Sequence, residues 1–231
     1  MSEPCRIFVG YDAREAAAFH VCVNSIIRHA VKPVAIIPLA LNTFASRYAE
    51  HHGDGSNEFI YSRFLVPYLC GFRGRALFID GDMLIRDDIT ELFEMARPFT
   101  GVSVVKRPDY ETKHRTKYLD APNENYPRKN WSSVILWECS FWPNRVLTPD
   151  YVARANGAHL HRFEWLEDHQ IGELPADWNW LVGEQEPNEA ARLLHFTIGL
   201  PAFPGYEKQD GAEEWWREFQ LTTEPVRSYG A

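Results

Sequence analysis

The chain has 231 residues, of which 45% are hydrophobic and 24% are charged, and its formal net charge is −8 at pH 7. This size suits one α/β domain or two small ones, and we expect a single domain over residues 1–231 that buries roughly 70% of its unfolded surface. The negative charge argues against a nucleic acid or an anionic membrane as the main partner, because those surfaces bind clusters of Lys and Arg.

Targeting signals and cysteine spacing favour a cytoplasmic protein. No stretch approaches 18 consecutive apolar residues, and the start, MSEPCRIFVG, has no basic leader before a long apolar region. The cysteines are Cys5, Cys22, Cys70 and Cys139, and none of them forms a CxxC or other metal-type spacing. They therefore indicate reduced, mostly buried thiols.

The first elements alternate between the strand and helix periods. Residues 5–10 predict a strand, residues 13–30 carry apolar side chains at helical spacing, and residues 33–41 predict a second strand. A strand, a helix and a strand in this order indicate a parallel sheet with helices on its faces.

The following segments continue this pattern as far as residue 157. They predict a helix over EFIYSRFLVPYLCGF, with Pro67 inside it or at its start. Strands are then predicted at RALFID, 101–106 and 132–140, and helices at 88–96 and 148–157. After residue 157 the pattern loosens into segments rich in Trp and Pro. The segment EEWWREFQ, after Gly205, predicts an amphipathic helix that caps the fold, packs in a dimer or touches a membrane acceptor.

One segment between 106 and 118, KRPDYETKHRTKY, is the only basic run, and acidic residues interrupt it. A solvated loop explains such a run. It could also serve a phosphate group locally.

The most informative segment is RGRALFIDGDMLIRDDI, residues 73–89, where two carboxylates interrupt an apolar run. Isolated buried charges cost several kcal/mol each unless a partner compensates them. Asp80 and Asp82 are two residues apart at the end of a strand, so they point the same way at about 6.6 Å, and Gly81 lets the chain turn and a ligand approach. Ligands bind beyond the carboxyl ends of the strands in open parallel sheets, and a divalent cation there would be the missing partner.

Three other interpretations of the triplet remain open. Paired acids also occur on solvated turns. A phosphatase of the haloacid dehalogenase type uses a similar pair with a nucleophilic first Asp, although Leu84 stands where that pattern has Thr or Val. A glycosidase uses two carboxyl groups, which normally come from separate strands.

Together the segments from about residue 5 to 205 resemble glycosyltransferase family eight, the retaining nucleotide-sugar transferases of GT-A fold. The resemblance implies a mixed, mostly parallel α/β sheet flanked by helices. The family begins with a strand that ends in a nucleotide-binding loop, which is IFVGYDA here. By resemblance, Gly10 and the Tyr11 ring hold uracil and Asp12 accepts a hydrogen bond from it. Asp12 could instead cap a simple strand-to-helix turn.

Three further motifs of the family fall in the middle of the chain. In IYSRFLVPYL, Arg63 matches the residue that contacts donor phosphate or sugar. In FIDGDMLI, Asp80 and Asp82 match the ligands of Mn²⁺, and Gly81 offers only its backbone to the ribose. In NWSSVILW, Asn130 matches a sugar contact, but Ser133 replaces the family's Gly.

The last two motifs depart further from the family. EDHQIGELPADWNWL is similar to a D-Q-x-x-x-N segment, which makes Asp168 and Gln170 candidates for the residue under the reactive face of the sugar. LLHFTIG resembles the start of HxxGxxKPW, which makes His195 the third metal ligand.

The second half of HxxGxxKPW matches poorly. Gly199 lies four residues past His195, and Leu200 and Pro201 stand where a Lys-Pro pair is expected. Lys208 could replace the phosphate-binding Lys, or the site lacks one.

The resemblance implies a retaining transferase that moves a hexose from a UDP-sugar with Mn²⁺, or Mg²⁺, on the D-x-D motif. The acceptor could be a saccharide, a lipid-linked group or a protein, and a homo-oligomer is compatible with the tail helix. The alternative from another class is a non-catalytic nucleotide-sugar or carbohydrate binding protein of the same fold.

Overall fold

The structure is a computed structural model that describes residues 3–44, 47–53, 57–118 and 122–224. Within these residues, a six-stranded sheet has the order β2-β1-β3-β6-β5-β7, and a small sheet has the order β4-β9-β8. The strands are β1 (Cys5–Tyr11), β2 (Val34–Ala40), β3 (Arg75–Ile79), β4 (Met83–Ile85), β5 (Val102–Val105), β6 (Val134–Glu138), β7 (Ile171–Leu174), β8 (Trp180–Leu181) and β9 (Leu193–His195).

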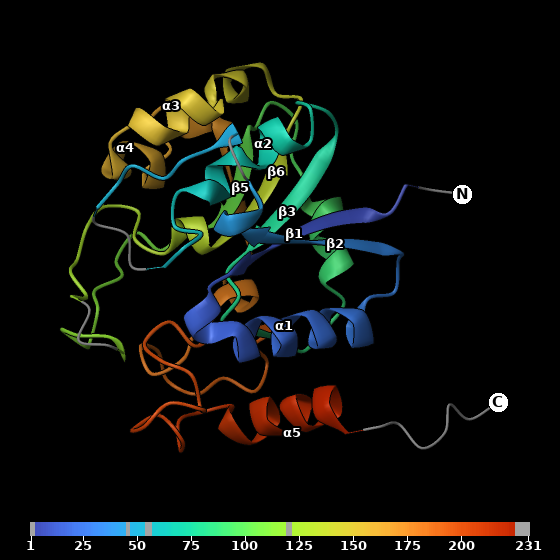
Figure 1. The fold of residues 1–231 in the computed structure, drawn as a ribbon, viewed down its shortest axis with the longest axis vertical. Coiled ribbons are helices and arrows are strands. Elements are labelled where there is room, and N and C mark those ends of the chain that lie inside the picture. Colours follow the sequence, from blue (N-terminus) through green and yellow to red (C-terminus); the bar gives the residue numbers. More distant parts are fainter. Residues whose placement is uncertain (1–2, 45–46, 54–56, 119–121, 225–231) are drawn as a thin grey trace.

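Helices cover both faces of the large sheet (Figure 1). The α-helices are α1 (Ala16–His29), α2 (Val66–Leu69), α3 (Pro149–Arg154), α4 (Gly157–His161) and α5 (Ala212–Thr223). The 3₁₀ helices include η1 (Ala13–Glu15), η2 (Leu41–Thr43), η4 (Ser62–Leu65), η5 (Ile89–Met95), η7 (Trp131–Ser133), η8 (Trp142–Val146), η9 (Asp168–Gln170) and η10 (Ala176–Asn179).

The large sheet is mixed and mostly parallel, as predicted. β1 pairs in parallel with β2 and β3, and β5 pairs in parallel with β7. β6 is antiparallel to both of its neighbours, β3 and β5. The alternation of strands and helices in the first half of the chain thus produced the expected α/β fold.

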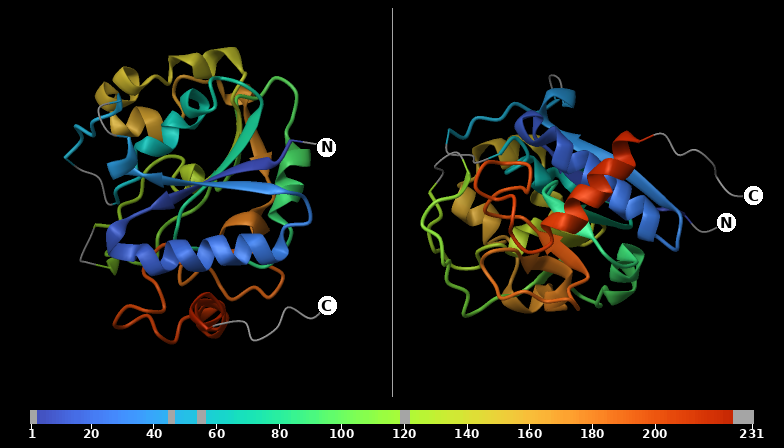
Figure 2. Two further views of the ribbon diagram at one scale, coloured as in Figure 1. Left: turned by 45° about the vertical axis from the view of Figure 1, so that its right-hand side comes forward. Right: turned by 90° about the horizontal axis from the view of Figure 1, so that it is seen from below.

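Alternating side chains of β1 separate the core into two layers. Ile7 and Val9 pack with residues of α1, whereas Phe8 packs with residues of α2, α3 and α4 on the opposite face. Successive side chains of a strand point to opposite faces, so one strand supplies both layers. In Figure 2, α1 runs along one face of the sheet, and α3 and α4 lie on the other.

The tail helix α5 packs on α1, as the view from below in Figure 2 shows. Trp215 is buried against Ala18 and Val21 of α1. Asn24 of α1 donates a hydrogen bond of 2.5 Å to the carboxylate of Glu218, which also pairs with Arg28. Of the three roles predicted for this helix, the structure therefore supports capping of the fold.

Two predicted helices are shorter than expected. The segment from Glu58 to Phe72 forms only η4 and α2, with Pro67 in the first turn of α2. The helix predicted over 148–157 breaks after Arg154, because the Asn156 side chain accepts from the backbone N–H of Ala158 at 2.8 Å and begins α4.

Candidate functional site

Asp80, Asp82 and His195 converge where the two sheets meet. Asp80 follows β3, Asp82 precedes β4, and His195 ends β9. β4 and β9 are antiparallel with Met83 opposite His195, and this register brings a residue 113 positions along the chain to the acidic pair. One potential ligand atom from each of the three side chains lies within 4.8 Å of the others.

The imidazole of His195 is oriented by Asn179 in η10. His195 Nδ1 lies 2.9 Å from Asn179 Oδ1, and the Asn179 amide N–H groups donate to Ser133 Oγ at 2.9 Å and to the Asn130 carbonyl at 3.3 Å. Because the Asn179 amide donates on one side, its oxygen accepts the proton of His195 Nδ1. In the neutral ring, Nε2 then presents a lone pair 3.4 Å from Asp82 Oδ1 and 3.9 Å from Asp80 Oδ2. Metal-binding His residues are commonly held by such a partner.

Arg63 compensates part of the buried negative charge. Its guanidinium lies 2.7 Å from Asp80 Oδ1, and it donates to the Ser132 carbonyl at 2.8 Å. It also lies over the rings of Phe59 and Phe78. Arg63 is therefore a compensating partner of Asp80, in addition to the divalent cation that the sequence predicts. Burial nevertheless raises the pKa of Asp80 to about 6, with Asp82 adding to the effect and Arg63 opposing it.

The donor set fits a divalent cation. Two carboxylates and one imidazole offer oxygen and nitrogen ligands of the kind that Mn²⁺ and Mg²⁺ accept. Apart from the His195 ring 3.4 Å away, the buried Asp82 Oδ1 has no hydrogen-bond partner among the described residues. A buried acceptor without a donor is costly, so a bound cation would satisfy it.

A polar cavity of about 130 Å³ lies beside the cluster and is open to solvent. Its lining includes the predicted residues Arg63, Asp80, Asp82, Asn130, His195 and Gly199. Asn130 adopts a left-handed backbone conformation, with φ of 63°.

Sequence reasoning missed several residues of the lining. They are Glu15, Asn57, Tyr126, His161 and Lys117. Burial raises the pKa of Glu15 to about 8, and the charge of Asp82 adds to the effect. The signal for Lys117 is the basic run over 106–118, which a solvated loop also explains.

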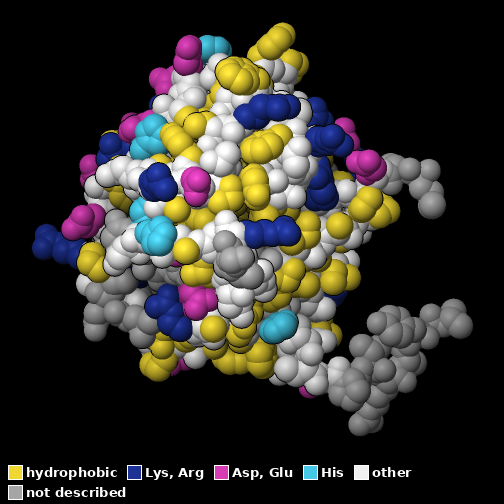
Figure 3. Space-filling model, turned by 45° about the horizontal axis from the view of Figure 1, so that its top comes forward, with side chains coloured by type: hydrophobic (Ala, Val, Ile, Leu, Met, Phe, Trp, Pro, Cys, Tyr) yellow, Lys and Arg dark blue, Asp and Glu magenta, His cyan; other side chains and the backbone are white. Residues whose placement is uncertain are grey.

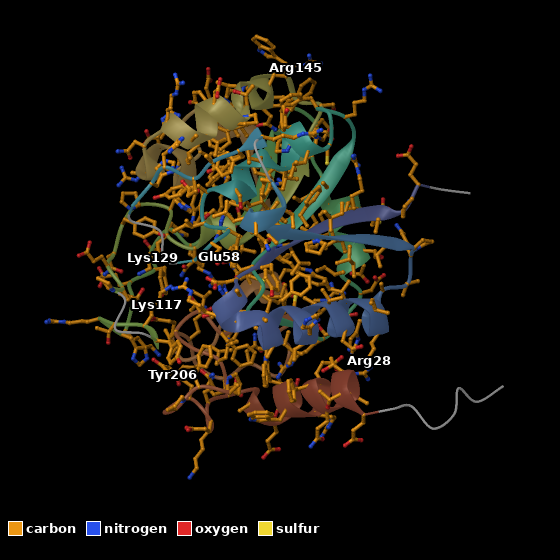
Figure 4. All side chains as sticks on the ribbon, in the orientation of Figure 1. Arg28, Glu58, Lys117, Lys129, Arg145 and Tyr206 are labelled. Carbon is orange, nitrogen blue, oxygen red and sulfur yellow. The ribbon has the colours of Figure 1, made fainter. Side chains whose placement is uncertain are left out.

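Lys117 enters the cavity from the loop that joins β5 to η7. Its ammonium donates to Thr197 Oγ1 at 3.1 Å, and in Figure 4 it lies on the side of the molecule where Lys129 and Glu58 also lie. Burial lowers its pKa, whereas the charges of Asp82 and Asp80 raise it. The loop thus places the Lys117 side chain in the same cavity as Asp80 and Asp82.

A buried carboxylate holds this loop in place. Glu184 is 3% exposed and accepts from Thr112 Oγ1 at 2.5 Å and from the Lys113 backbone N–H at 2.6 Å. It also accepts from the Asn123 amide at 3.0 Å. Hydrogen bonds to a charged acceptor are roughly twice as strong as neutral ones, so Glu184 contributes strongly to holding the loop.

The predicted nucleotide loop does not line the cavity. The carboxylate of Asp12 is taken by protein donors, since it caps η1 at the Arg14 N–H, pairs with the Arg14 guanidinium and accepts from the Glu58 N–H at 3.2 Å. The Tyr11 ring packs edge-on against Phe19. The capping interpretation of Asp12 matches this geometry.

The two glycines serve close packing. A Cβ on Gly10 would lie 2.5 Å from the Phe59 ring, and a Cβ on Gly81 would lie 2.2 Å from the carbonyl oxygen of Gly10. The lack of a side chain at Gly81 therefore makes room for the backbone of β1, whereas the sequence predicts room for a ligand.

Asp168, Gln170 and Lys208 also lie outside the cavity lining. Asp168 is exposed and pairs with Arg128, and Gln170 accepts from the Glu167 N–H at 3.0 Å within a capping box. Lys208 is exposed on the loop before α5. The structure does not bring these three residues to the acidic cluster.

Among the described residues, no helix is both long and apolar enough to cross a membrane. On the face shown in Figure 3, hydrophobic side chains are widespread, and acidic, basic and histidine side chains lie among them.

Several solved structures that superpose on this chain are glycosyltransferases. The galactosyltransferase LgtC, solved in complex with donor and acceptor sugar analogs, superposes with a TM-score of 0.60 at 13% identity, over 96% of this chain and 98% of LgtC. The bifunctional glycosyltransferase WbbM superposes with a TM-score of 0.59 at 14% identity over 95% of this chain, which spans 50% of the WbbM chain. At these identities the likeness establishes the fold, which is the GT-A fold.

A scan against models of protein families finds no match. Protein CDI of Arabidopsis thaliana is 39% identical to this chain over 226 residues, which cover 94% of this chain and 87% of that protein. An identity of this size over nearly the whole length reflects common descent, and the chain therefore belongs to the family of Protein CDI.

Proposed function

We propose that this protein is a metal-dependent glycosyltransferase that moves a hexose from a UDP-sugar to an acceptor hydroxyl. The observation that carries the proposal is the convergence of Asp80, Asp82 and His195 at the edge of a polar cavity in a GT-A fold. The choice of UDP and the retention of anomeric configuration rest on the resemblance to glycosyltransferase family eight.

The metal would be held by the three clustered side chains, with Mn²⁺ favoured modestly over Mg²⁺ because one ligand is an imidazole. When bound, a divalent ion stabilises the negative charge that grows on the leaving diphosphate. Asn179 keeps the Nε2 lone pair of His195 on the metal side, and Arg63 holds Asp80 in place.

Other residues of this chain would act on the donor directly. The bond from the anomeric carbon to the diphosphate breaks with its electron pair on the phosphate oxygen, while the acceptor oxygen bonds to that carbon and passes its proton to the departing phosphate oxygen. The Lys117 ammonium faces the acidic cluster, where it would pair with the diphosphate. This position supports Lys117, in place of Lys208, as the phosphate-binding cation.

The test is release of UDP from a panel of UDP-sugars with Mn²⁺, using the wild type and Asp82→Asn. The wild type should release UDP from at least one sugar, and the variant should be at least 100-fold slower, a loss of about 2.7 kcal/mol in transition-state stabilisation. Equal rates for the two proteins would contradict the assigned site.

A non-catalytic nucleotide-sugar binding protein is the second candidate. The observation that favours it is the position of Asp168 and Gln170, which lie outside the cavity and so cannot steady the reacting carbon in this conformation. Mn²⁺-dependent binding of UDP-sugars, without release of UDP under any condition, would support this alternative.

A further inference from the structure

The cavity has a second feature in its wall, the imidazole of His161 at the end of α4. His161 lines the cavity, and its Nε2 is buried and has no hydrogen-bond partner among the described residues. A buried polar atom without a partner typically costs about 1 to 3 kcal/mol. Since His161 borders the cavity, a ligand bound there would supply the missing partner.

The ring of His161 is held in one orientation. Its Nδ1 lies 2.7 Å from Ser132 Oγ, and its face and edges contact the rings of Phe64, at 5.2 Å between centroids, and Tyr61, at 5.7 Å. At the start of the same helix, Gly157 leaves room for Tyr61, because a Cβ there would lie 2.5 Å from the Tyr61 hydroxyl. The free nitrogen therefore occupies a fixed position.

His161 Nε2 carries the ring hydrogen in the tautomer that leaves the fewest polar groups without a hydrogen-bond partner. If the Ser132 hydroxyl donates to Nδ1, both polar groups of that contact are paired and Nε2 bears the proton. The opposite arrangement would leave the Ser132 hydroxyl proton without a partner among the described residues. Burial, with the nearby charge of Arg63, lowers the pKa of His161 to about 3, so the ring is neutral at pH 7.

A short chain of contacts links this donor to the candidate metal cluster. Arg63 pairs with Asp80 and donates to the carbonyl of Ser132, whose side chain contacts His161. A diphosphate held at Asp80 would therefore have its attached group within the same cavity as His161. A neutral N–H in this place matches an uncharged hydroxyl oxygen.

We propose that His161 donates a hydrogen bond from Nε2 to a hydroxyl of the transferred sugar, and that Ser132 positions its ring. His161 is then a specificity-determining residue that helps to distinguish one sugar from its epimers. The inference rests on the proposed function, since it assumes a sugar nucleotide in the cavity.

The test is calorimetric titration of Mn²⁺-loaded protein with UDP and with UDP-glucose, UDP-galactose, UDP-N-acetylglucosamine and UDP-xylose. His161→Phe keeps an aromatic ring but removes the donor, and it should bind UDP within twofold of the wild type. Its affinity for the preferred UDP-sugar should fall roughly tenfold, the effect of losing one buried hydrogen bond. His161→Gln should recover part of the loss, because its amide can again donate.

Two further variants separate a specific from a structural effect. Ser132→Ala should lower the same affinity by roughly threefold, because the ring loses its positioning bond. This variant carries the test if His161→Phe fails to fold. His159→Gln, on the same helix, is the matched control and should leave every affinity unchanged.

Several results would overturn the inference, and they can be told apart. If the wild type binds UDP-sugars and His161→Phe binds them with unchanged affinity and preference, the inference fails while the proposed function stands. If His161→Phe loses affinity for UDP and for UDP-sugars equally, the role of His161 is structural. A wild type that binds Mn²⁺ but neither UDP nor any UDP-sugar would remove the proposed function as well.

Discussion

At the residue scale, the orientation of His195 decides whether the acidic pair can hold a metal. The bond between His195 Nδ1 and Asn179 Oδ1 leaves Nε2 as the atom nearest to Asp82 and Asp80. His195 and the two aspartates could be predicted from the sequence, because all three matched motifs. Asn179 could not, because a buried amide becomes recognisable only once its partners are known.

The first prediction concerns this supporting bond. In Asn179→Ala the imidazole loses its positioning partner, so the affinity for Mn²⁺ should fall by about 10- to 100-fold, the usual effect of removing the partner of a metal-bound His. Calorimetric titration with Mn²⁺ measures it, and Asn188→Ala, on an exposed loop, is the control. Unchanged affinity in Asn179→Ala would show that His195 is positioned by other contacts.

The second prediction concerns acid stability and His161. Its pKa is about 3 in the folded protein and 6.5 in the unfolded chain, so below pH 6.5 the unfolded state binds more protons. The stability that His161 contributes above pH 6.5 is therefore lost as the pH falls from 6.5 towards 3.

Urea unfolding at pH 7 and pH 5 measures this effect. The midpoint of the wild type should drop more between the two pH values than the midpoint of His161→Gln, because the variant lacks the titrating ring. His20→Gln removes an exposed histidine and should behave as the wild type does. Parallel drops for the wild type and His161→Gln would refute a neutral, buried His161.

At the scale of elements, close contact between β1 and the turn after β3 places the acidic pair. The absence of a side chain at Gly81 allows the carbonyl of Gly10 to approach. The strands and the turn were predictable from apolar runs and from the Asp-Gly-Asp triplet. This backbone contact was not, because it joins two segments that are 71 residues apart.

The third prediction follows from this contact. Gly81→Ala should lower the free energy of unfolding by about 1 to 3 kcal/mol, because its Cβ would overlap backbone that cannot move freely. Chemical unfolding of the two proteins gives the difference. Gly53→Ala is the matched control, since no heavy atom of the described residues lies within 4 Å of a Cβ built there. Equal destabilisation by both changes would mean that close packing is not the reason for Gly81.

The loop from β5 to η7 is the second element that forms the site. Its basic run was visible in the sequence, but its inward course depends on Glu184, which lies 67 residues after Lys117. Local patterns could not reveal that a buried acid from elsewhere folds the loop over the cavity.

The fourth prediction concerns this anchor. Glu184→Gln removes the negative charge that accepts three hydrogen bonds, each worth about 1.5 to 3 kcal/mol when the acceptor is charged. Amide hydrogen exchange over residues 110–118 should become at least tenfold faster, and affinity for UDP should fall with it. Glu186→Gln breaks only an exposed pair with Lys113 and should change neither. If amide hydrogen exchange over residues 110–118 is unchanged in Glu184→Gln, contacts other than those of Glu184 hold the loop in place.

At the scale of the whole molecule, the chain joins two sheets around one acidic site. The large sheet could be predicted because its strands and α1 have clear periods of two and 3.6 residues. The small sheet could not, because β4, β8 and β9 have only three, two and three residues. Yet β9 carries His195 to the site, so the resemblance to a known family predicted a contact that periodicity could not.

Titration of the whole protein with Mn²⁺, followed by electron paramagnetic resonance, tests the metal site of Asp80, Asp82 and His195 most directly. We expect the wild type to bind one Mn²⁺ per chain, and Asp82→Asn and His195→Phe to lose this binding while both variants remain folded. A wild type that binds no Mn²⁺, or variants that bind it as tightly as the wild type, would show that these side chains hold no metal.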